Sequence, residues 1–286
     1  MSILAIDIGG TKLAAAVVGD DGTMYDRMQA PTPDGDDAEA LFAALVALLE
    51  RIGFDDAVVV GVGCGGPMER GGEHVSPLNI PAWRGFPLRG RVAEYTGLPT
   101  FVDGDAKALA LGEGWLGAAR GCDNYLGMVV STGVGGGIVL DGRLLDGATG
   151  NAGHVGHVIV EPDGHECGCG ARGCVEAEAS GTAIERITGR PPAEAPPEII
   201  VRSGTLVGRA VASVANLLDL DRAVVAGSVA LGYGEPFFAA AQAEVDARCR
   251  LSYSRGTRIV RGALGADGPL IGAAAVARRQ GRSAAS

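Results

Sequence analysis

ILAIDIGGTKLAAAVV occupies residues 3–18. Its first apolar run predicts a buried strand, its two glycines a tight turn, and its second apolar run a strand that returns beside the first. A similar stretch, YLGMVVSTGVGGGIVL, occupies residues 125–140. Each stretch is followed by alternating helical and strand patterns. This repetition predicts two similar α/β lobes with a cleft between them.

The composition restricts the class of function. The chain has 286 residues, a formal net charge of −10 and 47 glycines, which suit tight turns and close backbone approach to a ligand. Nucleic-acid binding needs clustered Lys and Arg, so we expect no nucleic-acid partner. No apolar run reaches the ~18 residues of a membrane-spanning helix, and no signal peptide is visible. We therefore expect a cytoplasmic protein without a membrane partner.

The first glycine turn carries groups that suit a phosphate. A strand ends at Asp7, and Gly9 and Gly10 let backbone N–H groups face an anion without obstruction by a Cβ. Thr11 adds a hydroxyl donor, and Lys12 follows it. The carboxylate of Asp7 is a ligand type that Mg²⁺ prefers. An ordinary Gly-Gly hairpin is the alternative interpretation.

The second glycine stretch, Ser131–Gly137, lies at the matching place of the second lobe. Taken alone, it is also compatible with a plain hairpin turn. Two such loops at matching positions are much harder to explain by chance than one. Together they predict a pair of loops that clamp a polyphosphate across the cleft.

The segment Asp103-Gly104-Asp105 lies between a predicted strand and a predicted helix. A carboxylate at the end of such a strand faces the cleft, where it is placed to act as a general base. We assign this role to Asp105. The alternative is that Asp105 serves only as the N-cap of the helix, a position that Asp favours.

A histidine and three cysteines form the strongest local signal in the chain. His157, Cys167, Cys169 and Cys174 supply four ligands suited to tetrahedral Zn²⁺. Crowding of three of the six cysteines fits a metal site in a reducing compartment better than a disulfide framework. Four protein ligands leave no open position, so the predicted zinc is structural. A cluster of free loop thiols is the alternative. His154 lies close to this motif in the sequence.

Taken together, these motifs resemble the ROK family (repressors, open reading frames and sugar kinases) of the actin and hexokinase superfamily. The resemblance covers nearly the whole chain. The two glycine stretches resemble the family's phosphate loops, and Val225–Ser228 resembles its adenosine motif. Cys174-Val175-Glu176 matches the C-[IVL]-E signature that follows its zinc ligands.

The resemblance implies two actin-like, ribonuclease H-like lobes around a cleft. We divide the chain into a small N-terminal α/β lobe of residues 1–104 and a larger α/β lobe of residues 105–268 that carries the zinc loop. The family's closing helix, here residues 269–286, is expected to complete the N-terminal lobe. A homodimer is also implied.

The resemblance further implies an ATP-dependent kinase of carbohydrate metabolism. It would phosphorylate the 6-hydroxyl of a hexose or amino sugar with Mg²⁺, and Asp105 aligns with the catalytic base. The residues that match the family's nucleotide and phosphate contacts are Asp7, Gly9, Gly10, Thr11, Lys12, Thr132, Gly133, Gly227 and Ser228. The residues that match its sugar contacts are Gly66, Asp105, His154, His157 and Glu176.

Two departures from the family pattern bear on the sugar. Gly104 replaces an Asn that usually donates to a sugar hydroxyl, and His154 replaces a Glu that contacts the anomeric end in glucose-type members. A histidine there resembles bacterial N-acetylmannosamine kinases, although those generally retain the Asn. We expect glucose or an amino-glucose such as kanosamine, with N-acetylmannosamine as the alternative. ATP is the expected donor, with polyphosphate as an open alternative.

Two other function classes remain as alternatives. Some members of the family are sugar-responsive regulators, but those carry a helix-turn-helix ahead of the kinase lobes, whereas here the phosphate loop begins at residue 7. A catalytically inactive sugar-binding module is disfavoured because both carboxylates and both glycine loops are present. We therefore expect an enzyme.

Overall fold

The computed structural model describes residues 1–283, which divide into two compact units. The first unit comprises residues 1–116, 146–152 and the described residues from 266 onward, and the second comprises 117–145 and 153–265. The short segment 146–152 thus belongs to the first unit, although the chain on both sides of it belongs to the second. Residues 284–286 of the predicted closing helix lie outside the described residues.

The first unit is built on a sheet of β1 (Ser2–Ile8), β2 (Lys12–Val18), β3 (Met24–Pro31), β4 (Ala57–Cys64) and β5 (Thr100–Gly104). The strand order is β3-β2-β1-β4-β5. β1 pairs antiparallel with β2 and parallel with β4, and β5 is parallel to β4. The three parallel strands end at one edge of the sheet, which is where open α/β sheets bind their ligands.

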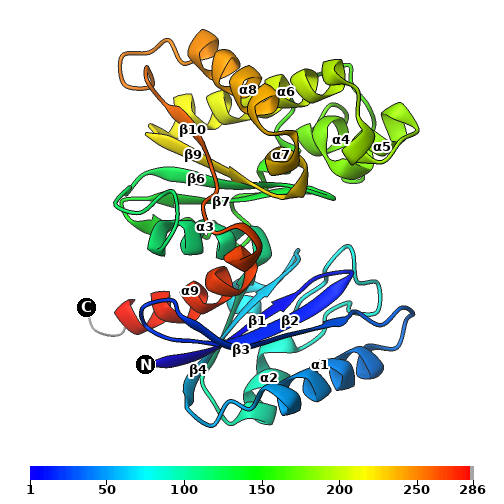
Figure 1. Cartoon of the computed structure of the whole chain (residues 1–286), viewed down its shortest axis with the longest axis vertical. Coiled ribbons are helices and arrows are strands. Elements are labelled where there is room, and N and C mark those ends of the chain that lie inside the picture. Colours follow the sequence, from blue (N-terminus) through cyan, green and yellow to red (C-terminus); the bar gives the residue numbers. More distant parts are fainter. Residues whose placement is uncertain (284–286) are drawn as a thin grey trace. The chain divides into compact units, whose positions relative to one another are not determined.

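Helices cover both faces of this sheet, namely α1 (Ala38–Ile52), α2 (Leu88–Thr96), α3 (Asp105–Trp115) and α9 (Gly268–Ser283). In Figure 1, α1 and α2 lie on one face of the sheet and α9, in red, lies on the other. Because side chains alternate along a strand, Leu4, Ile6 and Ile8 of β1 share the core that α1 completes. On the α9 side, a Cβ on Gly61 would lie 2.0 Å from the carbonyl oxygen of Ala273.

Helix α3 packs against α9 just as closely. A Cβ on Gly272 of α9 would lie 2.6 Å from the carbonyl oxygen of Ala108 in α3. This contact groups α3, and with it Asp105, with the first unit. The division drawn from the sequence instead placed residues 105–268 together.

The second unit is built on a sheet of β6 (Tyr125–Val130), β7 (Val134–Leu140), β8 (Arg143–Leu144), β9 (Arg222–Ala226) and β10 (Arg258–Arg261). The strand order is β10-β9-β6-β7-β8. β7 is antiparallel to both of its neighbours, and β9 is parallel to both of its own. This is the pairing of the first sheet repeated, with β6 in the place of β1. The prediction of two similar α/β lobes is confirmed.

The helices of the second unit are α4 (Val175–Ala179), α5 (Gly181–Thr188), α6 (Pro197–Leu218), α7 (Ser228–Tyr233) and α8 (Glu235–Arg248). Helices α6 and α8 run side by side over the sheet (Figure 1). Their backbones approach closely at Gly204 of α6, where a Cβ would lie only 2.3 Å from the carbonyl oxygen of Phe237 in α8. Their apolar side chains complete the core above β6 and β9.

The second glycine loop is shorter than predicted. β7 begins at Val134, so residues 135–137 pair with β6 as strand residues instead of facing a ligand. A Cβ on Gly136 would lie 2.7 Å from a methyl group of Val155. This glycine therefore makes room for the turn that carries the predicted sugar-binding histidines, and only Ser131–Gly133 remains as a loop.

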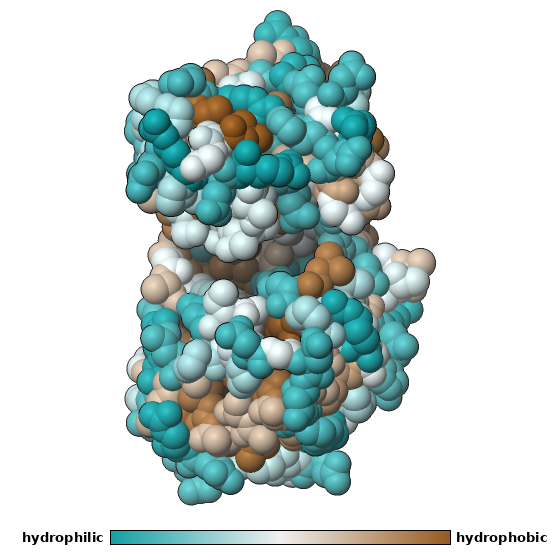
Figure 2. Space-filling model, turned by 90° about the vertical axis from the view of Figure 1, so that its right-hand side faces the viewer, coloured by the Kyte–Doolittle hydropathy of each residue, from teal (hydrophilic) through white to brown (hydrophobic). Residues whose placement is uncertain are grey.

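Among the helices of residues 1–283, none combines the length and apolar character that a bilayer span requires. On the face drawn in Figure 2, hydrophilic residues cover much of the surface, and apolar residues lie among them.

Candidate functional site

The predicted site residues fall into two groups. The first unit holds Asp7, Gly9, Gly10, Thr11, Lys12, Gly66 and Asp105. The second unit holds Thr132, Gly133, His154, His157, Cys167, Cys169, Cys174, Glu176, Gly227 and Ser228. Within each unit, the structure brings most of these residues to the ends of the central strands.

The two predicted carboxylates of the first unit lie at the edge where its parallel strands end. In the sheet, Asp7 of β1 pairs with Gly63 of β4, which pairs in turn with Asp103 of β5. A Cβ on Gly63 would lie 3.8 Å from Oδ1 of Asp7 and 3.8 Å from Cα of Asp105. Because Gly63 has no side chain, the space between Asp7 and Asp105 stays open.

Burial changes the proton affinity of Asp7. The residue is only 8% exposed, and burial together with the negative charge of Asp105 raises the pKa of Asp7 to about 7, although Lys12 opposes the shift. A buried carboxylate beside a second carboxylate is a favourable ligand for a divalent cation, which supplies the missing positive charge. These two groups therefore fit a magnesium ion.

We expect Asp7→Asn to stabilise the ligand-free protein at pH 8 and to change its stability much less at pH 5. Because the folded-state pKa is raised, the stability that the neutral carboxyl contributes is present below the unfolded-state pKa of about 4. It is lost as the pH rises through about 7. Thermal unfolding in the absence of added metal ions and ligands should show a midpoint difference that widens from pH 5 to pH 8. The exposed Asp56→Asn serves as control, and an equal difference at both pH values would contradict the shift.

The turn between β1 and β2 presents backbone donors. The N–H of Gly9 donates to the carbonyl oxygen of Lys12 at 3.0 Å, so the segment is a hairpin turn. In the described part of the chain, the N–H groups of Gly10 and Thr11 have no acceptor, and they are available to an anion. A Cβ on Gly10 would lie 2.8 Å from the carbonyl oxygen of Asn79. No local pattern in the sequence pointed to that Asn79 contact.

Gly66 begins a loop that hydrogen bonds hold in place. Its carbonyl oxygen accepts from the N–H of Leu78 at 3.2 Å. Two residues further on, the N–H of Met68 donates to Oδ1 of Asn151 at 3.2 Å, and the Met68 carbonyl oxygen accepts from Nδ2 of Asn151 at 2.9 Å. The predicted sugar-binding loop is therefore tied to the segment 146–152.

Asp105 is the first residue of α3, and Gly104 occupies the N-cap position. The alternative interpretation of Asp105 as the N-cap is therefore wrong. Oδ1 of Asp105 accepts a hydrogen bond from the N–H of Ala106 at 2.7 Å, which orients the carboxylate. A Cβ on Gly104 would meet only the side chain of Lys107, at 3.7 Å. The backbone does not require a glycine there.

In the second unit, Glu176 holds the end of the loop Ser131–Gly133. Its Oε2 accepts from the N–H of Val134 at 2.9 Å, and a Cβ on Gly133 would lie 2.9 Å from the same oxygen. Within residues 1–283, the N–H groups of Thr132 and Gly133 find no protein acceptor. This loop thus offers an anion the same kind of donors as the first one.

Gly227 and Ser228 lie next to that loop. Gly227 has a φ of +100°, and a Cβ on it would lie 2.3 Å from the carbonyl oxygen of Val130 at the end of β6. Oγ of Ser228 lies 2.9 Å from Oγ of Ser131. The predicted adenosine motif and the predicted second phosphate loop are therefore neighbours.

The two predicted sugar-binding histidines occupy one turn of the second unit. The rings of His154 and His157 are nearly parallel, with centroids 6.2 Å apart. Gly156 lets this turn lie against β7, because a Cβ on it would lie 2.1 Å from the carbonyl oxygen of Val134. The turn is tied to the helix that carries Glu176 by the N–H of Val175, which donates to the carbonyl oxygen of Val158 at 2.9 Å.

The four predicted zinc ligands come together. Their ligand atoms all lie within 4.8 Å of one another. Nδ1 of His157 lies 3.6 Å from Sγ of Cys167, and Sγ of Cys169 lies 3.7 Å from Sγ of Cys174. A tetrahedral ion with Zn–S bonds of about 2.3 Å and a Zn–N bond of about 2.0 Å separates its ligands by roughly these distances. The cluster is consistent with a zinc site.

The thiol groups reinforce this assignment. Burial and hydrogen bonds with Cys167 and Cys169 raise the pKa of Cys174 to about 12. Three thiolates so close together repel one another, and a bound cation removes that repulsion. Nδ1 of His157 faces the sulfur atoms, so its Nε2 is the ring nitrogen left for another partner.

Lys107 was not among the predicted site residues, although it is buried beside Asp105. It is only 6% exposed, and its ammonium group lies 2.8 Å from Oδ1 of Asp103 and 3.1 Å from Oδ1 of Asp146. The spacing of four between Asp103 and Lys107 was a usable signal for the first pair. The pair with Asp146 had no local signal because 39 residues separate the two.

Comparisons with known proteins agree with this arrangement. Residues 3–280 match the ROK family. The N-acetylmannosamine kinase of Citrobacter koseri is 40% identical over 250 residues, which cover 82% of this chain and 86% of that protein. The structure of the ROK hexokinase from Thermus thermophilus has a TM-score of 0.86 and 34% identity, covering 99% of this chain and 100% of that one. The ROK family glucokinase from Streptomyces griseus, in complex with glucose and AMPPNP, has a TM-score of 0.84 and 29% identity, covering 98% and 100%.

Proposed function

The chain belongs to the ROK family, and we propose that this sugar kinase transfers the γ-phosphoryl group of ATP to the 6-hydroxyl of N-acetylmannosamine. The observation that carries the reaction class is the edge of the first sheet. That edge carries a carboxylate at the start of α3, a second carboxylate on β1, and a turn in which the N–H groups of Gly10 and Thr11 are unpaired in the described chain. A base, a metal ligand and anion-binding donors are the parts that phosphoryl transfer uses.

Each group has a defined role in the reaction. Asp105 accepts the proton of the sugar hydroxyl as that oxygen attacks the γ-phosphorus, while the bond from the γ-phosphorus to the bridging oxygen breaks and ADP leaves. The free N–H groups of each glycine loop are donors suited to phosphate oxygens, and Asp7 would hold a Mg²⁺ ion, which would neutralise charge on the phosphates. Since the protein does little covalent work, the rate depends on how well these groups are positioned.

The proposed zinc is a structural ion. His157, Cys167, Cys169 and Cys174 would hold it, and it would supply a cross-link to the loop 157–174 and no chemistry of its own. Holding that loop also holds Glu176, two residues after the last ligand, and thereby the end of the second glycine loop. Nε2 of His157 would remain available for a sugar hydroxyl.

The sugar is better supported as N-acetylmannosamine than as the glucose or kanosamine that we expected from the sequence. A relative that is 40% identical over most of the chain is an N-acetylmannosamine kinase. His154, in place of the Glu of glucose-type members, points the same way. Glucose remains the second candidate because the glucokinase from Streptomyces griseus, at 29% identity, was solved with glucose and AMPPNP.

A sugar panel tests this proposal. ADP release with Mg·ATP is measured with glucose, kanosamine, glucosamine, mannose, N-acetylglucosamine, N-acetylmannosamine and fructose. We expect kcat/KM to be at least about tenfold higher for N-acetylmannosamine than for glucose, since buried polar contacts discriminate against a sugar that leaves them unpaired. A preference for glucose or kanosamine would restore the first expectation, and silence with every sugar would contradict the kinase.

The same assay addresses the phosphate donor, because polyphosphate can replace ATP in it. ATP is supported by the AMPPNP in the Streptomyces griseus structure. The homodimer and the cytoplasmic location stay predictions.

A further inference from the structure

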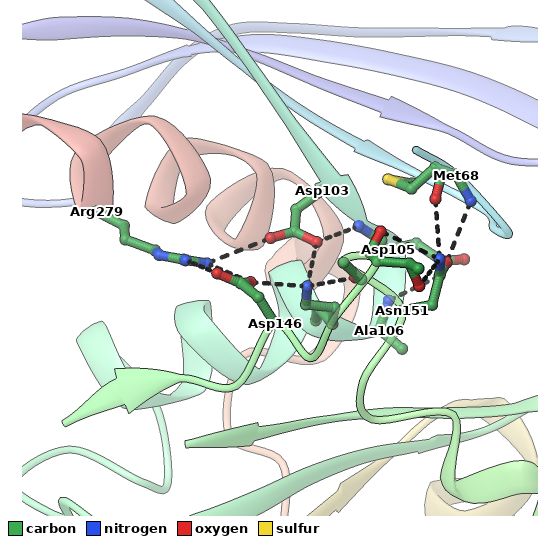
Figure 3. A network of polar contacts seen from close by, with 11 residues as sticks. Met68, Asp103, Asp105, Ala106, Asp146, Asn151 and Arg279 are labelled. Atoms are coloured by element: carbon green, nitrogen blue, oxygen red, sulfur yellow. Dashed lines mark hydrogen bonds and ion pairs between the residues drawn. The ribbon is translucent and has the colours of Figure 1, made fainter. Parts of the chain in front are cut away.

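A network of four charged side chains lies in the first unit beside the proposed base. The carboxylate of Asp146 forms ion pairs with two cations. Its oxygens lie 3.1 Å from Nζ of Lys107 and 2.5 and 3.3 Å from the two terminal nitrogens of Arg279. The same two cations also pair with the carboxylate of Asp103, Lys107 at 2.8 Å and Arg279 at 3.4 Å. Figure 3 shows how this network joins α9, the start of α3 and the strand that precedes it.

The charges in this network are balanced. Two carboxylates face two cations, and the ammonium group of Lys107 also donates to the carbonyl oxygen of Gly150 at 3.0 Å. Burial raises the pKa of Asp146, but hydrogen bonds from Arg279 and Lys107 outweigh this and hold the pKa below its ordinary value. Asp146 is therefore ionised at neutral pH, and removing it leaves two cations facing one carboxylate. An uncompensated buried charge is costly, so this change disturbs the local packing.

The segment 146–152 is held at both of its ends. Asp146 ties its beginning to α3 and α9, while Asn151 ties its end to both backbone groups of Met68. Between them, Gly150 has a φ of +92°, and a Cβ on it would lie 3.2 Å from Cα of Arg70. The segment therefore lies directly against the loop that Gly66 begins (Figure 3).

We propose that Asp146 is a positioning residue for the sugar. Paired with Lys107 and Arg279, it places the segment 146–152, and through Asn151 the loop at Gly66, relative to the base at the start of α3. This inference rests on the proposed function. Within the described part of the first unit, the ion pairs and hydrogen bonds of these four side chains lie outside the turn 9–12, so we place their effect on the sugar side of the site.

The test is Asp146→Asn in the full-length protein. We expect KM for N-acetylmannosamine to rise about tenfold, because even a small displacement of the groups that position a substrate weakens its productive binding. KM for ATP should stay within about twofold. The variant is expected to fold, since Asp146, Asp103 and Arg279 line a pocket of about 380 Å³ where water can hydrate the groups left unpaired. Sugar binding by calorimetry should weaken by the same factor.

Controls separate positioning from stability. Asp267→Asn removes the exposed ion pair with Arg27 just before α9 and should leave both KM values unchanged. Asp146→Glu should recover most of the sugar affinity. The double variant Asp146→Asn with Arg279→Gln should raise KM for the sugar by less than the product of the two single-variant effects, because the two residues interact directly.

Two failures are distinguishable. If the wild-type protein is active and Asp146→Asn keeps its sugar KM, or raises both KM values equally, the inference is wrong while the kinase stands. If the wild-type protein neither binds nor phosphorylates any sugar of the panel, the proposed function fails and the inference fails with it.

Discussion

Asp105→Ala is expected to lower kcat about a thousandfold and to change the dissociation constant of the sugar by less than about threefold. A positioned general base contributes roughly 10²- to 10⁴-fold to a proton transfer, and no second carboxylate is assigned to the sugar hydroxyl. The sugar retains its other proposed contacts, so binding survives. Coupled ADP release gives kcat, and calorimetry gives the sugar affinity.

Asp105→Asn is the matched control for structure. Its side-chain oxygen can still accept the hydrogen bond from the N–H of Ala106, but it cannot take a proton from the sugar. We expect it to be as inactive as the Ala variant and to unfold at the wild-type temperature. Near-normal turnover by either variant would show that another group is the base.

Cys174→Ser is expected to remove the zinc and to destabilise the second unit strongly. Cys174 is fully buried, and its sulfur lies 3.7 Å from that of Cys169. Structural zinc in small domains contributes about 10 kcal/mol or more, which is comparable to the whole stability of a domain. We expect the main unfolding midpoint to fall by more than about 10 °C and activity to be lost.

Metal analysis and thermal unfolding check this prediction together. The wild-type protein, purified without chelator, should hold one zinc per chain. Cys122→Ser is the control, because Cys122 lies in the same unit but outside the cluster, so it should keep both the zinc and the midpoint. A wild-type protein that lacks zinc yet is stable and active would contradict the assignment.

Both lobes were predictable from the sequence because their signals are local. The hairpins at Asp7–Lys12 and after residue 130 follow from apolar runs interrupted by glycines, and these patterns report strands and turns directly. The zinc cluster was equally readable, because three of its ligands lie within eight residues and a metal of known geometry requires them to converge. The glycines of β7 were misread as a loop, since the same residue type serves a close packing contact.

The sequence by itself therefore determined the two α/β lobes, the glycine turns at their strand ends and the ligand set of the metal cluster. Only the tertiary structure decided that the segment 146–152 packs in the first unit and that Asp146 meets Lys107 and Arg279 there. The physical reason is the range of the interactions. Strand periodicity and turns depend on neighbouring residues, whereas the pairing of buried charges depends on which distant segments the packing brings into contact.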